Sequence, residues 1–229
     1  MRIGIVGDIH EPFSHPMYRR FCEDIFDQWD VNHVHMIGDI VDNHDISFHE
    51  SSAENIGAKS ELFKAKANVA IWHKSFPKAT VSIGNHDALH FRRARREGLP
   101  DFFLKDYKDV WGTPSWEWKL HHVFDGIRYQ HGTNTSGKNA ALNQAVNRRK
   151  SVVQGHTHCY AGVTWHTNDD NRIFGLNVGC GIDINAYAFE YAKDFPIRPV
   201  LGCGVVIDGH PYFESMQCGP GEPYHRSRA

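Results

Sequence analysis

The sequence predicts an α/β protein with two sheets in its core, and two observations lead to this prediction. In the first third, short apolar runs that end at glycine alternate with segments of helical periodicity, which indicates parallel strands joined by crossover helices. In the second half, short strand-like runs follow one another around turns, which favours antiparallel pairing. A chain of 229 residues, 41% of them hydrophobic and 23% charged, is long enough for one sizeable core.

The first third reads as strand, helix, strand, helix, strand. Apolar, β-branched runs predict strands at residues 3–6, 34–37 and 79–83. Apolar side chains at three- and four-residue spacing predict helices at 16–29 and 58–76. Pro16 suits a first helical turn, and Pro77 stops the second helix. The polar residues 42–57 are expected to be irregular.

The second half is predicted to consist mostly of short strands. They are expected at residues 116–120, 123–124, 127–130, 152–153, 161–167, 172–178, 203–207 and 211–216. One helix is expected at 137–149, with Ser136 at its N-cap. We expect a single domain over residues 1–218 and a loose, polar tail over 219–229.

Composition narrows the class of protein. A formal net charge of −2 gives no global electrostatic reason to bind nucleic acid or a membrane surface. There is neither an apolar run long enough to span a bilayer nor a signal-peptide pattern. Five scattered cysteines without a CxxC pair indicate reduced thiols, so we expect a cytoplasmic protein. Seventeen histidines point toward a metal site.

Five short polar segments carry the residue types of such a site, and each follows a strand-like run. They are Gly7–His10, Gly38–Asp42, Gly84–Asp87, His131–Gly132 and Gly155–His158. Ligands bind at the carboxyl ends of strands in open α/β sheets, and glycine lets the backbone approach closely there. Oxygen and nitrogen donors without thiolate suit Mn, Fe, Zn or Ni. Each segment alone is weak evidence, but all five together favour a hydrolytic site with two metal ions.

These segments resemble the calcineurin-like metallophosphoesterase superfamily, whose blocks run GDxH, GDxxD, GNH(D/E), H and GHxH in that order. The resemblance covers roughly residues 3–180. It implies a four-layer α/β/β/α sandwich with two mixed sheets. It also implies two divalent transition-metal ions, manganese first, with iron, zinc or nickel as alternatives. The implied reaction is hydrolysis of phosphodiesters or small phosphomonoesters by attack of a metal-bridging hydroxide.

The resemblance also assigns roles residue by residue. The first metal would be held by Asp8, His10 and His158. The second would be held by Asn85, His131 and His156, with Asp39 bridging both. His86 would protonate the leaving oxygen or hold the substrate phosphate, and Asp42 would orient His86 as in a carboxylate–histidine pair.

Two departures from protein Ser/Thr phosphatases disfavour that branch. Asn43 stands where they carry arginine, and Asp87 stands where they carry glutamate. A phosphodiesterase or a small-substrate phosphatase is therefore favoured.

Other side chains are candidate substrate contacts. They are His44, beside the second block, and Arg92 and Arg93, in an arginine run expected to begin a helix. This run keeps a DNA or RNA nuclease as an alternative. A catalytically silent scaffold of the same fold is the other alternative. The expected partner is a phosphate ester and not a membrane. Nucleic acid and the oligomeric state stay open.

Overall fold

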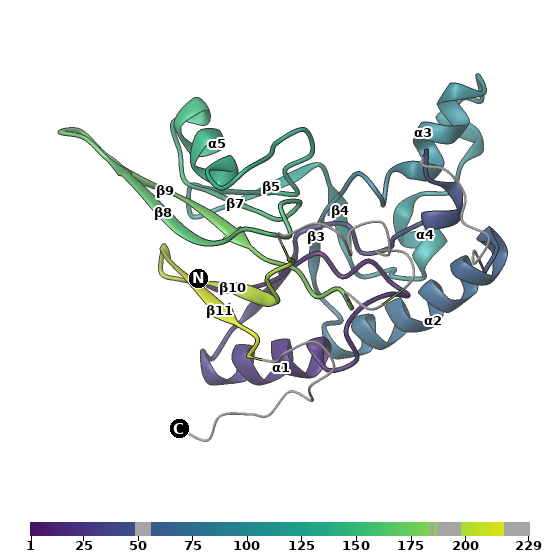
Figure 1. The fold of residues 1–229 in the computed structure, drawn as a ribbon, viewed down its shortest axis with the longest axis horizontal. Helices are drawn as coiled ribbons and strands as arrows, with labels where there is room; N and C mark the ends of the chain where they lie inside the picture. The colour runs from purple at the N-terminus through teal and green to yellow at the C-terminus, as the bar shows by residue number, and fades with distance from the viewer. Residues whose placement is uncertain (49–55, 184–185, 187–197, 218–229) are drawn as a thin grey trace.

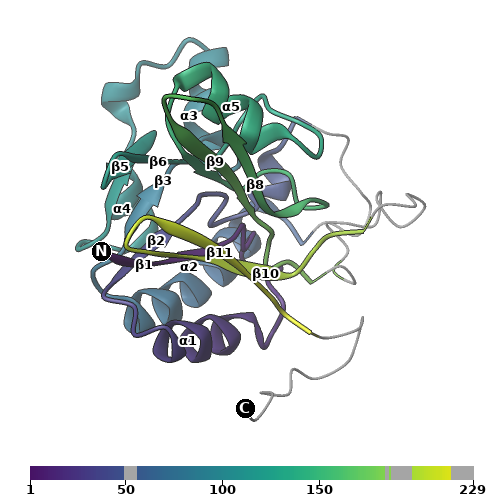
Figure 2. The same ribbon diagram turned by 90° about the vertical axis from the view of Figure 1, so that its left-hand side faces the viewer.

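The structure, a computed structural model, describes residues 1–48, 56–183, 186 and 198–217, and these form four layers (Figures 1 and 2). Helices α1 (Tyr18–Gln28) and α2 (Ala58–Ser75) cover the outer face of a six-stranded sheet. A five-stranded sheet packs on its inner face and carries α5 (Ala140–Arg148) outside. The predicted α/β/β/α sandwich with two mixed sheets is confirmed.

The first sheet has the strand order β11-β10-β1-β2-β3-β4. Its parallel members are β1 (Arg2–Val6), β2 (His33–Met36), β3 (Thr80–Ser82) and β4 (Glu117–Lys119). The antiparallel members are β10 (Gly202–Ile207), beside β1, and β11 (His210–Ser215). The parallel pairing expected for the first third is therefore confirmed.

The second sheet has the order β5-β6-β7-β9-β8. Its strands are β5 (His121–Phe124), β6 (Ile127–Gln130), β7 (Val152–Gln154), β8 (Ala161–Thr167) and β9 (Arg172–Val178). The expectation of antiparallel pairing in the second half holds for β5–β6 and β8–β9 but is wrong for β6–β7 and β7–β9, which are parallel. Helix α5 lies between β6 and β7 in the chain, and such a crossover makes its flanking strands parallel.

The helices agree with the prediction less closely at their ends. Asn139, not Ser136, occupies the N-cap of α5, and it makes no side-chain cap hydrogen bond. Gly137 has φ 80°, a left-handed conformation that cannot continue a right-handed helix, so α5 begins after it. Helix α3 (Leu89–Arg96) follows the third polar segment as expected. Three short helices were not predicted: η1 (His44–Ile46), η2 (Asp101–Phe103) and α4 (Tyr107–Trp111).

Two apolar layers hold the sandwich together. Phe21 of α1 and Trp72 of α2 pack on the first sheet, and Ile5, Tyr129 and Leu176 fill the space between the sheets. Each fully buried side chain of this size contributes roughly 1.5–3 kcal/mol. The two sheets therefore form one rigid support for the loops at their carboxyl ends.

Two expectations concern the ends of the chain and its relation to membranes. The predicted loose tail, residues 219–229, lies outside the described residues. Within the described part of the chain, no helix combines the length and the apolar character needed to cross a bilayer.

Candidate metal centre

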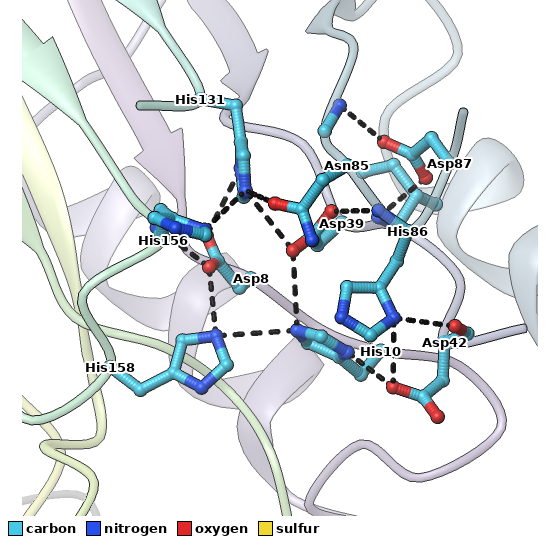
Figure 3. A network of polar contacts seen from close by, with 12 residues as sticks. Asp8, His10, Asp39, Asp42, Asn85, His86, Asp87, His131, His156 and His158 are labelled. Carbon is cyan, nitrogen blue, oxygen red and sulfur yellow. Dashed lines mark hydrogen bonds and ion pairs between the residues drawn. The ribbon is translucent and has the colours of Figure 1, made fainter. Parts of the chain in front are cut away.

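Side chains from the loops that follow five strands meet in one network of polar contacts (Figure 3). Three groups of side chains there could hold a metal ion, because the ligand atoms of each group lie within 4.8 Å of one another. The first is Asp8, His10, Asp39 and His158, the second is Asp39, His131 and His156, and the third is His10, Asp42 and His86. The Asn85 Oδ1 atom lies 3.0 Å from the His131 Nε2 atom of the second group. The first two groups and Asn85 contain all seven predicted ligands, and Asp39 is common to these two groups.

Two of the histidine rings are oriented by oxygen atoms behind them. The Nδ1 atom of His10 lies 2.6 Å from Asp42 Oδ1, and that of His131 lies 3.2 Å from the Ile37 carbonyl oxygen. Because these oxygens are acceptors, each Nδ1 carries the proton. The Nε2 atoms then point into the cluster, as where His131 Nε2 lies 3.0 Å from Asp39 Oδ2. A cation between them would satisfy both atoms.

The carboxylate of Asp8 also fits a metal ion. Its Oδ2 accepts hydrogen bonds from the His156 amide at 2.8 Å and from His158 Nε2 at 2.9 Å. Its Oδ1 is buried and has no hydrogen-bond partner among the described residues. An unsatisfied buried oxygen is costly, and a metal ion would remove that cost. The donor set of carboxylate, amide and imidazole suits a divalent transition metal.

The acidic groups of the cluster are held in the ionised state. Burial alone would raise the pKa of Asp8, but the neighbouring His131 and His158 lower it below its usual value. Burial is likewise outweighed at Asp39, where His131 and His86 hold the pKa well below its usual value. Burial would lower the pKa of His131, but Asp39 and Asp8 raise it to about 9. The cluster therefore presents anionic oxygens to a cation.

Three of the candidate ligands have left-handed backbone conformations that non-glycine residues rarely adopt. They are His10, Asp39 and His156, with φ of 48°, 46° and 66°. The loops around them are tied together: the amides of Ile9 and His10 donate to the Asp39 carbonyl oxygen at 3.2 and 2.9 Å. Such strain persists where surrounding contacts over-determine it, and it concentrates at functional sites.

Glycines permit the close approach of the backbone to two carboxylates, as the sequence predicts. A Cβ atom on Gly84 would lie 2.1 Å from Asp39 Oδ1, and one on Gly155 would lie 2.0 Å from Asp8 Oδ1. Real Cβ atoms essentially never come this close to another heavy atom. Any side chain at Gly84 or Gly155 would therefore displace the neighbouring carboxylate.

His86 lies beside the cluster, with its ring edge-on to His10 at a centroid distance of 4.6 Å. Its Nδ1 donates to the Asp42 carbonyl oxygen at 2.6 Å, whereas the Asp42 carboxylate is 3.5 Å from the same atom. Asp42 thus positions two rings: its carboxylate orients His10 and its carbonyl group orients His86. Burial acts to lower the pKa of His86, but Asp39 and Asp42 outweigh burial and raise it.

Asp87 has a structural role that the sequence analysis missed. Its Oδ1 accepts from the amides of Ile40 and Val41 at 2.9 and 3.3 Å, and its Oδ2 accepts from the Gly84 amide at 2.9 Å. One buried carboxylate thereby fastens the loop of Asp39 to the loop of Asn85. Burial and the nearby Asp39 raise the pKa of Asp87 to about 7. The available signal in the sequence was an acidic residue that closes the third block.

The predicted substrate contacts take different places. His44 lies beside the cluster, with Nδ1 3.7 Å from Asp42 Oδ2. Arg93 donates through Nε to the Ile46 carbonyl oxygen at 2.8 Å and also to the Ser47 carbonyl oxygen. The guanidinium groups of Arg92 and Arg93 lie over the Phe48 ring, 5.2 and 4.3 Å from its centroid. These arginine contacts brace the loop around η1, and a role in substrate binding stays a prediction.

Comparison with known proteins gives a family and a set of solved structures. The family model for calcineurin-like phosphoesterases matches residues 1–177. The phosphoesterase YfcE from E. coli is 16% identical, with a TM-score of 0.48 over 91% of this chain and 89% of that one. Vps29 from Chaetomium thermophilum is 10% identical, with a TM-score of 0.48 over 98% and 93%. A Vps29 single mutant from Entamoeba histolytica is 14% identical, with a TM-score of 0.43 over 93% and 97%. No curated protein sequence matches the chain.

Proposed function

Because the chain belongs to the calcineurin-like phosphoesterase family, we propose that it is a dinuclear-metal-dependent hydrolase of phosphate esters. The observation that carries this proposal is the position of Asp39. Its carboxylate belongs to two of the three groups of side chains that could hold an ion, and these two groups contain six of the seven predicted ligands. A carboxylate with two oxygens is suited to bridge two ions, as two-metal hydrolysis requires.

Each ion has a defined set of donors in this proposal. Asp39 completes both sets. The first is Asp8, His10 and His158, and the second is Asn85, His131 and His156. Divalent ions bound there, manganese first and iron, zinc or nickel as alternatives, would supply Lewis-acid activation of water and of the phosphate ester.

His86 is the proposed acid. The Asp42 carbonyl oxygen accepts its Nδ1 proton, which leaves Nε2 for the substrate. The ring is partly exposed, with 26% of the side-chain surface accessible, so a substrate can reach it. From Nε2 the imidazolium can donate a proton to the leaving oxygen or a hydrogen bond to the phosphate. Asp42 acts as the positioning residue.

Phosphodiesters and small phosphomonoesters are the proposed substrates. Asn43, which stands where protein Ser/Thr phosphatases carry arginine, donates through Nδ2 to the His86 carbonyl oxygen at 2.9 Å. It therefore supports the loop of His86 and offers no cation to a phosphate dianion. A phosphodiester carries less negative charge than a phosphate dianion and needs such a cation less. A small phosphomonoester would have to be bound by other residues.

The test is hydrolysis of bis-p-nitrophenyl phosphate by the purified chain with Mn²⁺. We expect Asp39→Asn to lose metal binding and turnover. We expect His86→Gln to keep its metals and lose roughly 10²–10⁴-fold in kcat. His166→Gln, on the exposed strand β8, is the matched control and should match wild type. Wild type that stays inert with Mn, Fe, Zn and Ni on a broad panel of monoesters and diesters would overturn the proposal.

A further inference from the structure

A pocket of about 170 Å³ borders the metal centre on the side of α5. Its lining includes Arg128 and Gln130 of β6, His131 directly after that strand, and Gln144 and Arg148 of α5. Because a water molecule takes up about 30 Å³ of the liquid, this space can hold an oxyanion with some of its hydration. His131 is thus a wall of the pocket and a member of the metal cluster at the same time.

The two arginines of this pocket are held by one chain of hydrogen bonds. Arg128 Nε donates to Gln130 Oε1 at 2.6 Å, and Arg148 Nε donates to Gln144 Oε1 at 3.2 Å. The two glutamines are joined by a 3.4 Å hydrogen bond from Gln130 Nε2 to Gln144 Oε1. The strand and the helix therefore fix both guanidinium groups at one pocket.

Neither arginine has an acidic partner. Within residues 1–48, 56–183, 186 and 198–217, no ion pair joins Arg128 or Arg148 to a carboxylate. Partial burial, and then the charge of Arg148, lower the pKa of Arg128. Burial, and then the charges of Arg128 and Arg148, lower the pKa of His121. This face thus carries a positive field that no described carboxylate compensates.

A helix terminus explains the position of only one of the two arginines. Arg148 is in the last turn of α5, where a cation is stabilised by the helix dipole. Arg128 lies on a strand and has no such reason to be there. Its charge is destabilised by burial and by Arg148, and an oxyanion between the two would remove that repulsion. Guanidinium groups bind phosphate through paired N–H donors, which suits this role.

We propose that Arg128 and Arg148 form a second phosphate subsite beside the metal centre, which binds a phosphate group of the substrate other than the one that is hydrolysed. The assignment rests on the proposed function for the reacting phosphate. It narrows the substrate class to phosphate esters that carry a second phosphate group. The subsite itself does not depend on the metals, because its donors come from β6 and α5 alone.

The first test measures binding without catalysis. Inorganic phosphate is titrated calorimetrically into the full chain, once loaded with Mn²⁺ and once treated with chelator. With Mn²⁺ a second phosphate can bind at the metal ions, and we expect one phosphate to bind to the chelated protein. We expect Arg128→Gln and Arg148→Gln each to weaken this binding roughly tenfold to hundredfold. Arg149→Asn is the matched control, because it removes a neighbouring positive charge outside the pocket and asparagine tolerates the φ of 53° there.

The second test compares two nucleoside p-nitrophenyl phosphodiesters that differ only in a second phosphate group on the sugar. We expect wild type to have a higher kcat/KM for the doubly phosphorylated ester. We expect Arg148→Gln, an exposed and therefore well-tolerated substitution, to reduce this preference roughly tenfold or more. Arg149→Asn should keep it.

The outcomes separate the two proposals. If no ester is hydrolysed with any metal, the proposed function fails, while the phosphate titration still decides the subsite. If esters are hydrolysed but the chelated protein binds no phosphate, the subsite is overturned. Equal phosphate binding by wild type and both arginine variants, or an unchanged substrate preference in Arg148→Gln, overturns it as well.

Discussion

Single atoms set the geometry of the metal centre, and the glycines before two of the ligand loops show this most directly. A methyl group on Gly84 or Gly155 would lie about 2 Å from a carboxylate oxygen of Asp39 or Asp8. We therefore expect Gly84→Ala and Gly155→Ala to lower Mn²⁺ affinity roughly 10–100-fold, measured by calorimetry, because each displaces a ligand. Gly98→Ala is the control: the φ of 74° strains the backbone there, but the methyl group meets nothing within 4 Å and displaces no ligand, so wild-type Mn²⁺ affinity is expected. Unchanged affinity in the first two variants would contradict this account.

Asp87 is a second residue whose removal we expect to be costly. Asp87→Ala leaves three backbone N–H groups without their acceptor, and an unsatisfied buried donor costs roughly 1–3 kcal/mol. Urea unfolding should show a loss of about 3 kcal/mol or more. Asp27→Ala, at an exposed site on α1, should unfold like wild type. If both variants unfold alike, Asp87 does not fasten the two loops.

For single residues, the sequence predicts which residues belong to the site better than it predicts the hydrogen bonds between them. All seven candidate ligands, named from short blocks, meet in the structure. The partners of Asp87 were not predicted, and the Asp42 carboxylate, predicted to orient His86, lies closest to His10 instead. The residues that these two carboxylates join are 47 and 32 positions apart. Such hydrogen bonds depend on how separate loops are brought together, and no local pattern encodes them.

Strands β2 and β5 bury histidines away from the metal centre, and this makes the stability of the protein sensitive to acid. Burial, and then the charge of His122, lower the pKa of His33 and hold that of His35 well below the usual 6.5. Burial also lowers the pKa of His122, although Glu117 on β4 acts in the opposite direction on His33 and His122. These groups bind protons more weakly when folded than when unfolded.

The sign of the pH effect follows from this difference. Below pH 6.5, the usual histidine value, the unfolded chain binds more protons, so the free energy of unfolding falls as the pH falls. Each proton that the unfolded chain binds and the folded protein does not changes the free energy of unfolding by up to about 1.4 kcal/mol per pH unit. In urea titrations from about pH 7.5 to about pH 5.5, His35→Gln should therefore lose stability less steeply than wild type. His166→Gln, on an exposed strand, should keep the wild-type slope; equal slopes in all three proteins would refute the prediction.

Several strands were predicted to the residue, whereas the helices of five residues or fewer were not predicted. The bounds of β6, β8 and β9 agree with the prediction to the residue. Helix α4 has five residues and η1 has three, too few to show a 3.6-residue repeat. The start of α5 was predicted too early because a left-handed glycine is not recognisable as such in a sequence.

For the whole molecule, the candidate metal centre combines residues that follow strands of both sheets. Asp8, Asp39 and Asn85 follow strands of the first sheet, whereas His131, His156 and His158 follow strands of the second. Ions that bind the folded state stabilise it by about 2.7 kcal/mol per site at a hundredfold excess over Kd. We expect Mn²⁺ to raise the melting temperature, and chelator to lower it, in calorimetric scans. In Asp39→Asn this response should disappear, and its persistence would place the metals elsewhere.

The arrangement of the whole sandwich was predicted through the resemblance of five blocks, not through strand pairing. Nothing in residues 202–215 indicates that β10 and β11 join the sheet of β1 instead of the sheet that precedes them. Apolar alternation fixes which face of a strand is buried, but the choice of neighbour depends on the packing of the complete chain.

The pairing of β1 with β10 also bears on synthesis of the protein. Arg2 pairs with Ile207, so one edge of β1 stays open until residue 207 has left the ribosome. At roughly 5–20 residues per second, synthesis of the residues between these two strands takes about 10–40 s. During translation the nascent chain carries an unpaired apolar strand edge that can join other chains. If the ribosome stalls before Gly202, β10 is never made and this edge of β1 stays unpaired.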